Sequence, residues 1–198
     1  MRKRVKIVPA HYGKLAFDWC YANRANQDAE LWGDLGEMYL YGHSVDENMD
    51  QALFWHRKAA VQGYAESQFQ LGHMYAFGIG VSEDGKEVER WWRLAAAQGH
   101  AMALINLAYI YEGGQHDVPQ NYEEAAKWYR IAADQGDYSA QIELCKMYAA
   151  GRGVPQDYEE AEKLFRQLLD RGYELATDLI LVQEILRMQK ELVAHRVA

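Results

Sequence analysis

Two short glycine-containing loops are the first places in this chain where chemistry could occur. The loops Gly78–Gly80 and Gly151–Gly153 have closely spaced glycines, as loops that bind phosphate groups do. A nucleotide-binding loop follows a strand and continues into Gly-Lys-Ser or Gly-Lys-Thr. Both loops here follow sequence with helical periodicity and lack that lysine. We therefore interpret them as turns.

Metal binding and nucleophilic catalysis need side chains at spacings that this chain lacks. Its histidines form no His-x-x-x-His pair, and its four serines lie in neither Ser-x-x-Lys nor Gly-x-Ser-x-Gly. The acidic pairs Glu123–Glu124 and Glu159–Glu160 could act as acid and base. They recur, however, beside the positive end of a predicted helix, where a helix-dipole role explains them. We expect no catalytic residue, no metal site and no cofactor.

The elements that would position any functional side chain come from a unit of about three dozen residues that occurs four times. A glycine closes each copy, and these glycines are Gly63, Gly99, Gly136 and Gly172. Such a period is typical of stacked repeats that share a continuous core. Gln27 occupies the same position before the first copy. We predict repeats at 28–63, 64–99, 100–136 and 137–172.

The first half of each repeat predicts a helix, here called helix A. It carries a leucine, then a small residue, and three positions later a tyrosine, and it ends at a glycine. In chain order these columns are Leu35, Leu71, Leu107 and Leu144; Gly36, Gly72, Ala108 and Cys145; Tyr39, Tyr75, Tyr111 and Tyr148; and Gly42, Gly78, Gly114 and Gly151. The spacing places a bulky pair beside a notch where another helix can approach, and the glycine suits a left-handed helix end.

The second half of each repeat predicts helix B. It begins with Asn or Asp followed three residues later by Gln or Glu, as in a capping box. The caps are Asn48, Asp84, Asn121 and Asp157, with Gln51, Glu87, Glu124 and Glu160 after them; the apolar columns are Ala52, Val88, Ala125 and Ala161, then Trp55, Trp91, Trp128 and Leu164, then Ala60, Ala96, Ala133 and Leu169. We expect these columns, and Trp19 one period earlier, to lie in the core.

Several stretches resemble the Sel-one-like repeat family, which is related to the tetratricopeptide repeat. They are Leu71–Tyr75 with Gly78–Val81, Trp128–Gly136, and Val154–Ala161, which Val118–Ala125 nearly duplicates. The resemblance covers residues 28–172 and implies an all-α fold, an α/α superhelix that forms a right-handed solenoid of helix-turn-helix repeats. Ser44 and Gln115–His116 interrupt the Gly-x-Gly loop in the first and third copies, which leaves the shape of those loops open.

Both ends of the repeat array depart from the pattern, as solenoid ends do. Ala16 and Trp19 predict that residues 1–27 hold a half repeat, a lone helix B that caps the array. Residues 173–198 predict an amphipathic C-terminal capping helix with a broad apolar side. The width of that side also permits a homodimer through this helix.

Charge and hydropathy limit the compartment and the partners. With 29 acidic and 21 basic residues the net charge is -8, which disfavours nucleic acid and anionic lipid. No stretch reaches the roughly 18 apolar residues of a membrane span. Arg2–Lys6 are followed too soon by polar residues to begin a signal peptide. Cys20 and Cys145 are too far apart along stacked helices for a disulfide, so we predict reduced thiols and a cytoplasmic location.

The resemblance to tetratricopeptide arrays implies a concave groove lined by helix A residues outside the Leu and Tyr columns. On this chain those partner-binding positions are Glu30, Glu37, Tyr41, Glu66, Phe69, His73, Phe77, Met102, Ile105, Tyr109, Glu112, Ile142 and Lys146. Phe69, Ile105 and Ile142 could instead be half-buried between repeats. The set describes an aromatic and aliphatic trough with an acidic margin, suited to an apolar peptide or helix flanked by Lys or Arg.

These observations predict a bacterial, non-enzymatic adaptor that binds a partner protein or peptide in the groove. Two alternatives stay open. One is an inhibitor, such as an immunity protein, whose negative surface covers a basic site on a toxin or enzyme. The other is a hydrolase of the β-lactamase type. That activity is associated with cysteine-rich relatives that carry regular cysteine pairs, which this chain lacks.

Overall fold

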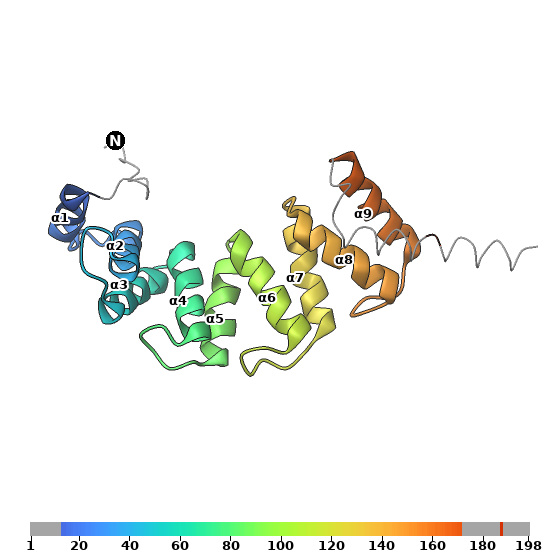
Figure 1. Ribbon diagram of the computed structural model, residues 1–198, viewed down its shortest axis with the longest axis horizontal. Helices are drawn as coiled ribbons and strands as arrows, with labels where there is room; N and C mark the ends of the chain where they lie inside the picture. The colour runs from blue at the N-terminus through green and yellow to red at the C-terminus, as the bar shows by residue number, and fades with distance from the viewer. Residues whose placement is uncertain (1–12, 172–186, 188–198) are drawn as a thin grey trace, which may run out of the picture. The chain divides into compact units, whose positions relative to one another are not determined.

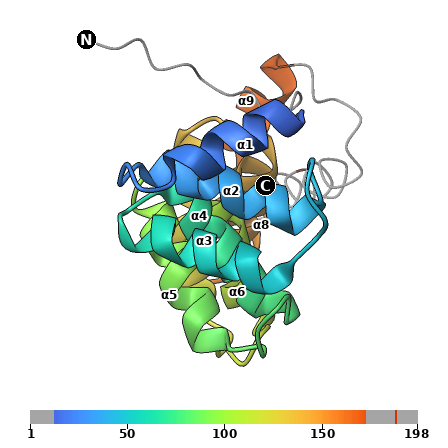
Figure 2. The same ribbon diagram turned by 90° about the vertical axis from the view of Figure 1, so that its left-hand side faces the viewer.

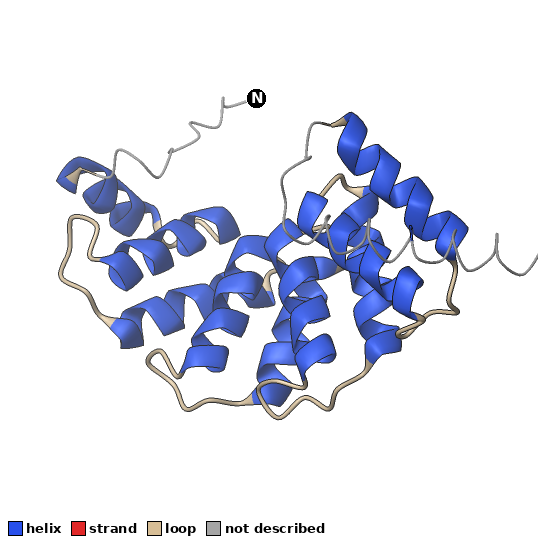
Figure 3. Cartoon of the chain, turned by 45° about the vertical axis from the view of Figure 1, so that its right-hand side comes forward, coloured by secondary structure: helices blue, strands red, loops and turns tan. Residues whose placement is uncertain are grey.

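The computed structural model describes residues 13–171 and Arg187. Within this part of the chain the regular structure is helical, with helices joined by short loops and no strand (Figure 3). The helices are α1 (Lys14–Asn23), α2 (Ala29–Tyr41), α3 (Met49–Val61), α4 (Ala65–Phe77), α5 (Gly85–Ala96), α6 (Ala101–Gly113), α7 (Tyr122–Asp134), α8 (Tyr138–Ala150) and α9 (Tyr158–Asp170). The predicted C-terminal capping helix at 173–198 and residues 1–12 lie outside the described residues.

The chain divides into two compact units, with the boundary between Ala103 and Leu104. In the first unit, α2 packs against α3 and α4 against α5, so that helices A and B of each repeat form a hairpin (Figure 1). Helix α1 lies on α2 (Figure 2). In the second unit, α8 packs against both α7 and α9. Helices A and B are therefore paired in the first, second and fourth repeats.

A close approach of helix B to the small residue of helix A forms the centre of each hairpin. The predicted Leu column is buried, with Leu35, Leu71 and Leu107 fully covered. A Cβ on Gly36 would lie 2.8 Å from three ring atoms of His56, and a Cβ on Gly72 would lie 2.2 Å from the Trp92 ring. Real Cβ atoms do not come so close, so these glycines are required where they stand.

The residues that fill these notches form a column that the sequence analysis missed. It is one position after the tryptophan column and consists of His56, Trp92, Tyr129 and Phe165, all buried. Its members differ in type, so the column has no common residue, and only their shared place in the repeat could have revealed it. In α8 the small residue is Cys145, whose Sγ lies 3.0 Å from the Ala161 carbonyl oxygen of α9.

The predicted N-caps of helix B are confirmed, but only half of the capping box forms. The side chains of Asn48 and Asn121 each accept a hydrogen bond from the backbone N–H three residues later, and Asp84 and Asp157 accept two each. In a full box the Glu or Gln would accept from the cap's own N–H. Here the backbone carbonyl of the helix A tyrosine accepts it instead, as Tyr39 does from Asn48 at 2.9 Å. Each tyrosine thereby ties helix A to helix B.

Side chains also link successive repeats. Arg57 of α3 donates to the Tyr75 hydroxyl at 2.8 Å, and Arg130 of α7 donates in the same way to Tyr148. A second link satisfies the open carbonyls at the end of helix B. Gln68 donates to the Ala60 carbonyl oxygen at 3.1 Å, and Gln141 donates to that of Ala133 at 3.2 Å.

Left-handed residues recur in the loops where the sequence departs from glycine, and the third loop, one residue longer than the others, has a second one at Asp117. Gly42, Gly78, Gly114 and Gly151 end helix A with φ between 64° and 67°, as predicted. Ser44 has φ 67° and His116 has φ 52°, so both adopt the left-handed conformation of Gly80 and Gly153 at the same place in the repeat. The loop shape therefore depends on this conformation more than on glycine itself.

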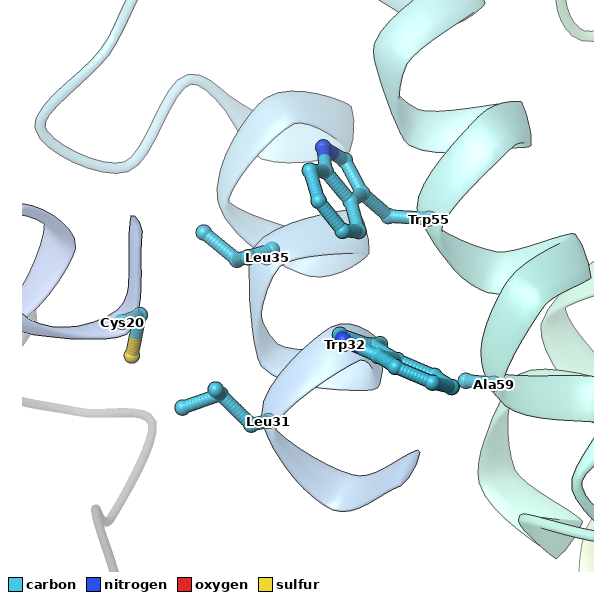
Figure 4. Packing of buried hydrophobic residues seen from close by; sticks show 6 residues of the cluster. All are labelled: Cys20, Leu31, Trp32, Leu35, Trp55 and Ala59. Atoms are coloured by element: carbon cyan, nitrogen blue, oxygen red, sulfur yellow. The ribbon is translucent and has the colours of Figure 1, made fainter. Parts of the chain in front are cut away.

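The prediction that Trp19 lies in the core is wrong. Its side chain is 52% exposed. Helix α1 instead packs Phe17 and the buried Cys20 against a cluster that includes Leu31 of α2 and Trp55 of α3 (Figure 4). Among the described residues α1 has α2 as its neighbour, so only one side of α1 is covered and the tryptophan lies outside that side.

Both cysteine thiols are free and buried. Burial raises the pKa of Cys20 to about 11 and that of Cys145 to about 12. Neither thiol is therefore a nucleophile at neutral pH, because the thiolate is the reactive form. Both act as small core residues.

Replacing Gln27 by glycine should stabilise the protein. Gln27 has φ 51°, and a residue other than glycine in the left-handed conformation destabilises the folded state by about 1–2 kcal/mol. Glycine avoids this strain but loses more backbone entropy on folding, which offsets part of the gain. We expect Gln27→Gly to raise the free energy of unfolding in urea by about 0.5–1 kcal/mol. The matched change is Gly63→Ala, at φ 88° with open space around the new Cβ, which should cost about 1 kcal/mol. The account would be contradicted if Gln27→Gly lowered the free energy of unfolding while Gly63→Ala also lowered it.

His56 should make the protein sensitive to acid. Burial lowers its pKa to about 4, although Glu66 acts to raise it. Between about pH 6.5 and 4 the unfolded chain takes up a proton at His56 that the folded protein does not, so stability falls as the pH falls, by up to about 3 kcal/mol. His56→Phe, which copies Phe165 of the last repeat, should remove this part of the dependence. Urea unfolding of both proteins at several pH values measures the difference, and parallel curves would refute it.

Candidate protein-binding surface

The first unit presents its predicted groove positions on α2 and α4 and at the start of α6. We call this the helix A surface; it consists of Glu30, Glu37 and Tyr41 of α2, Glu66, Phe69, His73 and Phe77 of α4, and Met102 of α6. Helices α2 and α4 contact each other. Tyr41 and Phe77 occupy the same position in successive repeats, and their side chains are 53% and 59% exposed.

Aromatic side chains form a stripe along α4 at four-residue spacing, which puts them on one helix face. The Phe69 and His73 ring centroids are 6.5 Å apart, and those of His73 and Phe77 are 4.6 Å apart. Phe69 is half-buried, because it also stacks on His100 at 4.7 Å and on Trp92 at 6.4 Å. Partial burial lowers the pKa of His73, so this ring is neutral at pH 7 and extends the apolar stripe.

His100 holds this stripe in place, and the sequence analysis did not identify it. Its Nδ1 accepts from the Ala103 N–H at 3.2 Å, as a helix N-cap does. With Nδ1 accepting, Nε2 carries the proton and donates to Glu66 Oε2 at 3.1 Å. The sequence could have revealed it through its repeat position. Asp28 and Asp137 stand at the same position in other repeats, and each caps a helix A.

Two carboxylates of the helix A surface lie close enough to affect each other. The hydrogen bond from His100 lowers the pKa of Glu66. Glu37 is half-buried, and burial followed by the charge of Glu66 raises its pKa. Glu37 has no hydrogen-bond or ion-pair partner among the described residues. The surface therefore carries a negative charge that this part of the protein does not neutralise.

The second unit offers fewer of the predicted positions to a partner. Ile105 and Ile142 are 9% and 5% exposed, so they belong to the core and do not line an open surface. Lys146 forms an ion pair with Glu143 at 2.9 Å, and both side chains are mostly covered. The physical reason is that these positions face neighbouring helices, as the sequence analysis allowed for the two isoleucines.

Tyr109 remains accessible in the second unit, with 43% of its side chain exposed. Its ring meets that of Tyr129 edge-on, with centroids 5.9 Å apart. The Tyr129 hydroxyl donates to Glu112 Oε2 at 2.7 Å. Glu112 is thus engaged within the protein, and Tyr109 is the predicted position of α6 in this unit that a partner could reach.

The described residues show neither a metal site nor a membrane-spanning helix. No group of three or more His, Cys, Asp or Glu side chains among them could hold a metal ion. None of the helices in this part of the chain has the length and apolar character needed to cross a bilayer.

Comparison with known proteins identifies the class. The family model described as Sel1 repeat matches four times, at residues 34–64, 65–100, 101–137 and 139–173. The chain therefore belongs to the Sel1 repeat family. Proteins of this family generally mediate protein–protein interactions and are typically non-catalytic scaffolds. A search of curated proteins found no match.

Two of the solved structures that are similar to this chain share 29% of its sequence where they align. One is a Sel1 repeat protein from Oxalobacter formigenes, with 29% identity, a TM-score of 0.71, and coverage of 79% of this chain and 64% of that one. The other is c5321, a protective antigen present in uropathogenic Escherichia coli strains that displays an SLR fold, with 29% identity, a TM-score of 0.74, and coverage of 89% and 41%. This chain thus spans less than two thirds of the length of either protein.

Glu37→Gln should stabilise the isolated protein. A carboxyl group with a raised pKa destabilises the folded state above that pKa, because the folded protein holds the proton more tightly than the unfolded chain. The neutral amide removes this penalty, and we expect about 0.2–1 kcal/mol in urea unfolding at pH 7, the range for single exposed charge interactions. The gain should vanish at acid pH, where Glu37 is already protonated. A loss of stability at pH 7 would contradict the inferred environment of this carboxylate.

Proposed function

We propose that this chain is a non-enzymatic adaptor that binds a segment of another protein on the helix A surface of its first unit. The segment that suits this surface has apolar side chains and a Lys or Arg beside them. Its apolar side chains would lie along α4, and its cation would lie next to Glu37. The second unit has an accessible aromatic position of its own, Tyr109.

The observation that carries the proposal is the exposure of Tyr41 and Phe77. More than half of each side chain is open to water, whereas the hairpins of the same unit bury Trp55, Trp91 and Trp92. Covering a side chain such as Phe77 completely contributes about 1.5–3 kcal/mol. Aromatic side chains of this kind commonly anchor protein–protein interfaces.

Charge determines which partner suits this surface. Glu30 is exposed, and Glu37 has no cation beside it among the described residues. A Lys or Arg of a partner would neutralise Glu37 and remove its repulsion with Glu66. The net charge of -8 also attracts basic partners at long range, which raises the association rate more than the affinity.

Charged substitutions at the exposed aromatic positions should abolish partner binding. We expect Phe77→Glu and Tyr41→Glu each to weaken binding at least tenfold, because each removes an apolar anchor and adds a carboxylate. Crosslinking and affinity purification from the source cell, with quantitative mass spectrometry, identify proteins captured by the native chain and lost with these variants. Titration calorimetry with the identified partner then measures the dissociation constant.

The matched control is Leu94→Glu. Leu94 is 42% exposed but lies on α5, a helix B, so it adds the same charge away from the helix A surface. It should leave binding unchanged, and circular dichroism should show equal helicity in all the variants. Equal loss of binding in Leu94→Glu and Phe77→Glu would reject the helix A surface as the binding site.

A further inference from the structure

Helix α3 presents a second apolar surface, separate from the helix A surface. Phe54 is 54% and Val61 is 68% exposed. They border a hollow of about 440 Å³ that Trp32 of α2 also lines. We call this the α3 hollow; its lining residues are Trp32, Asp50, Leu53, Phe54, Arg57, Lys58, Val61 and Gln62.

The other repeats show that the fold does not need apolar residues at these positions. In place of Phe54 they have Arg90, Lys127 and Lys163, and each of these forms an ion pair with the glutamate one turn earlier. In place of Val61 they have Ala97, Asp134 and Asp170. At these two positions the other repeats thus carry charged residues or alanine, where the first carries two large apolar side chains. Since this difference does not serve the packing of helices A and B, it calls for another explanation.

Two cations at the α3 hollow have no carboxylate partner among the described residues. The Lys58 Nζ lies 4.1 Å from the Trp32 ring centroid and 5.2 Å from that of Trp55, so its contacts are with aromatic faces. Arg57 donates to the Tyr75 hydroxyl, which is neutral. Asp50 is the one acidic residue in the lining. A chain with net charge -8 therefore places a local excess of positive charge beside an apolar hollow.

We propose that the α3 hollow is a docking site for an acidic partner segment, in which an apolar side chain is flanked by Asp or Glu. The apolar side chain fills the space between Phe54 and Val61 above Trp32. The carboxylates pair with Arg57 and Lys58, whose charges are otherwise unbalanced. The charge preference is opposite to that of the helix A surface. The two surfaces thus accept different partners, as a chain that joins two proteins requires.

The repeats themselves supply the test variant. Phe54→Lys combined with Val61→Asp copies the third repeat, where Lys127 and Asp134 stand. Both native side chains are more than half exposed, so the variant should keep the native helicity and unfolding midpoint. Val61→Asp alone is a second variant that disturbs the helix less. The double variant Arg57→Gln with Lys58→Gln removes the two charges and keeps the apolar walls.

The probe is a library of random 12-residue peptides displayed on phage, selected on the immobilised full chain and depleted on the third-repeat copy. We expect the enriched peptides to combine an apolar side chain with neighbouring Asp or Glu. A synthetic enriched peptide, followed by fluorescence anisotropy, should bind the third-repeat copy at least tenfold more weakly. The charge variant should bind it several-fold more weakly, and 0.5 M salt, at about a 4 Å Debye length, should reduce that difference.

Three results would overturn the proposal. The first is a selection that yields no peptide sensitive to Phe54 and Val61, and the second is one that yields basic peptides. The third is a self-association in sedimentation that the third-repeat copy abolishes, because the α3 hollow would then be an interface between copies of this chain. Phe77→Glu changes the helix A surface and should leave peptide binding at the α3 hollow unchanged. The result for the α3 hollow therefore does not depend on whether the helix A surface binds a partner.

Discussion

The contact between a bulky residue of helix B and a small residue of helix A is the constraint on which the rest of the structure depends. A Cβ at Gly72 would lie 2.2 Å from the Trp92 ring, so the two helices reach their observed distance only because that position has no side chain. This approach puts the tyrosine carbonyl of helix A within reach of the N-cap N–H of helix B. It also buries the leucine column, and with it Trp55 and Trp91. The first hairpin has the same geometry with Gly36 and His56 in place of Gly72 and Trp92.

This packing determines which faces of the helices are available for binding. One side of a helix packs against its hairpin partner, and another side contacts the neighbouring repeat. The hydrogen bonds from Arg57 to Tyr75 and from Gln68 to Ala60 are contacts of the second kind. The remaining outward strip of each helix packs against neither, so the fold does not restrict which residue types occur there. Differences between repeats in these strips, such as Phe54 against Lys127, are therefore the places where a binding role can be encoded without disturbing the core.

The distribution of charge separates the two surfaces of the first unit. Glu37 and Glu66 give the helix A surface a negative potential beside Phe69 and Phe77. Arg57 and Lys58 give the α3 hollow a positive one beside Phe54. Overall charge alone would describe the chain as uniformly acidic. Local pairing matters more for recognition, because an unpaired charge beside an apolar surface selects for a partner with the opposite charge.

The sequence by itself determined the elements of this protein. Recurring Leu, small and Tyr columns, Asx caps and closing glycines define the helices, because each acts over a few residues through helical periodicity and backbone hydrogen bonding. Even Gln27 was recognised as the equivalent of a glycine, and its φ of 51° agrees. Tyr41 and Phe77, which the resemblance to tetratricopeptide arrays implies for a groove, are both more than half exposed.

Only the tertiary structure decided which of the side chains at equivalent repeat positions are exposed to solvent and which are buried or paired within the protein. It buried Ile105 and Ile142, engaged Lys146 with Glu143, exposed Trp19 and placed His100 between Glu66 and Phe69. The structure also showed that His56 and Trp92 fill the notches at Gly36 and Gly72, a role that their differing residue types conceal in the sequence. The physical reason is that exposure depends on contacts between different helices, whose residues can be far apart in the sequence, as His100 and Glu66 are with a separation of 34 positions. A repeat pattern gives the position of each residue within its own hairpin but leaves open what the next hairpin covers.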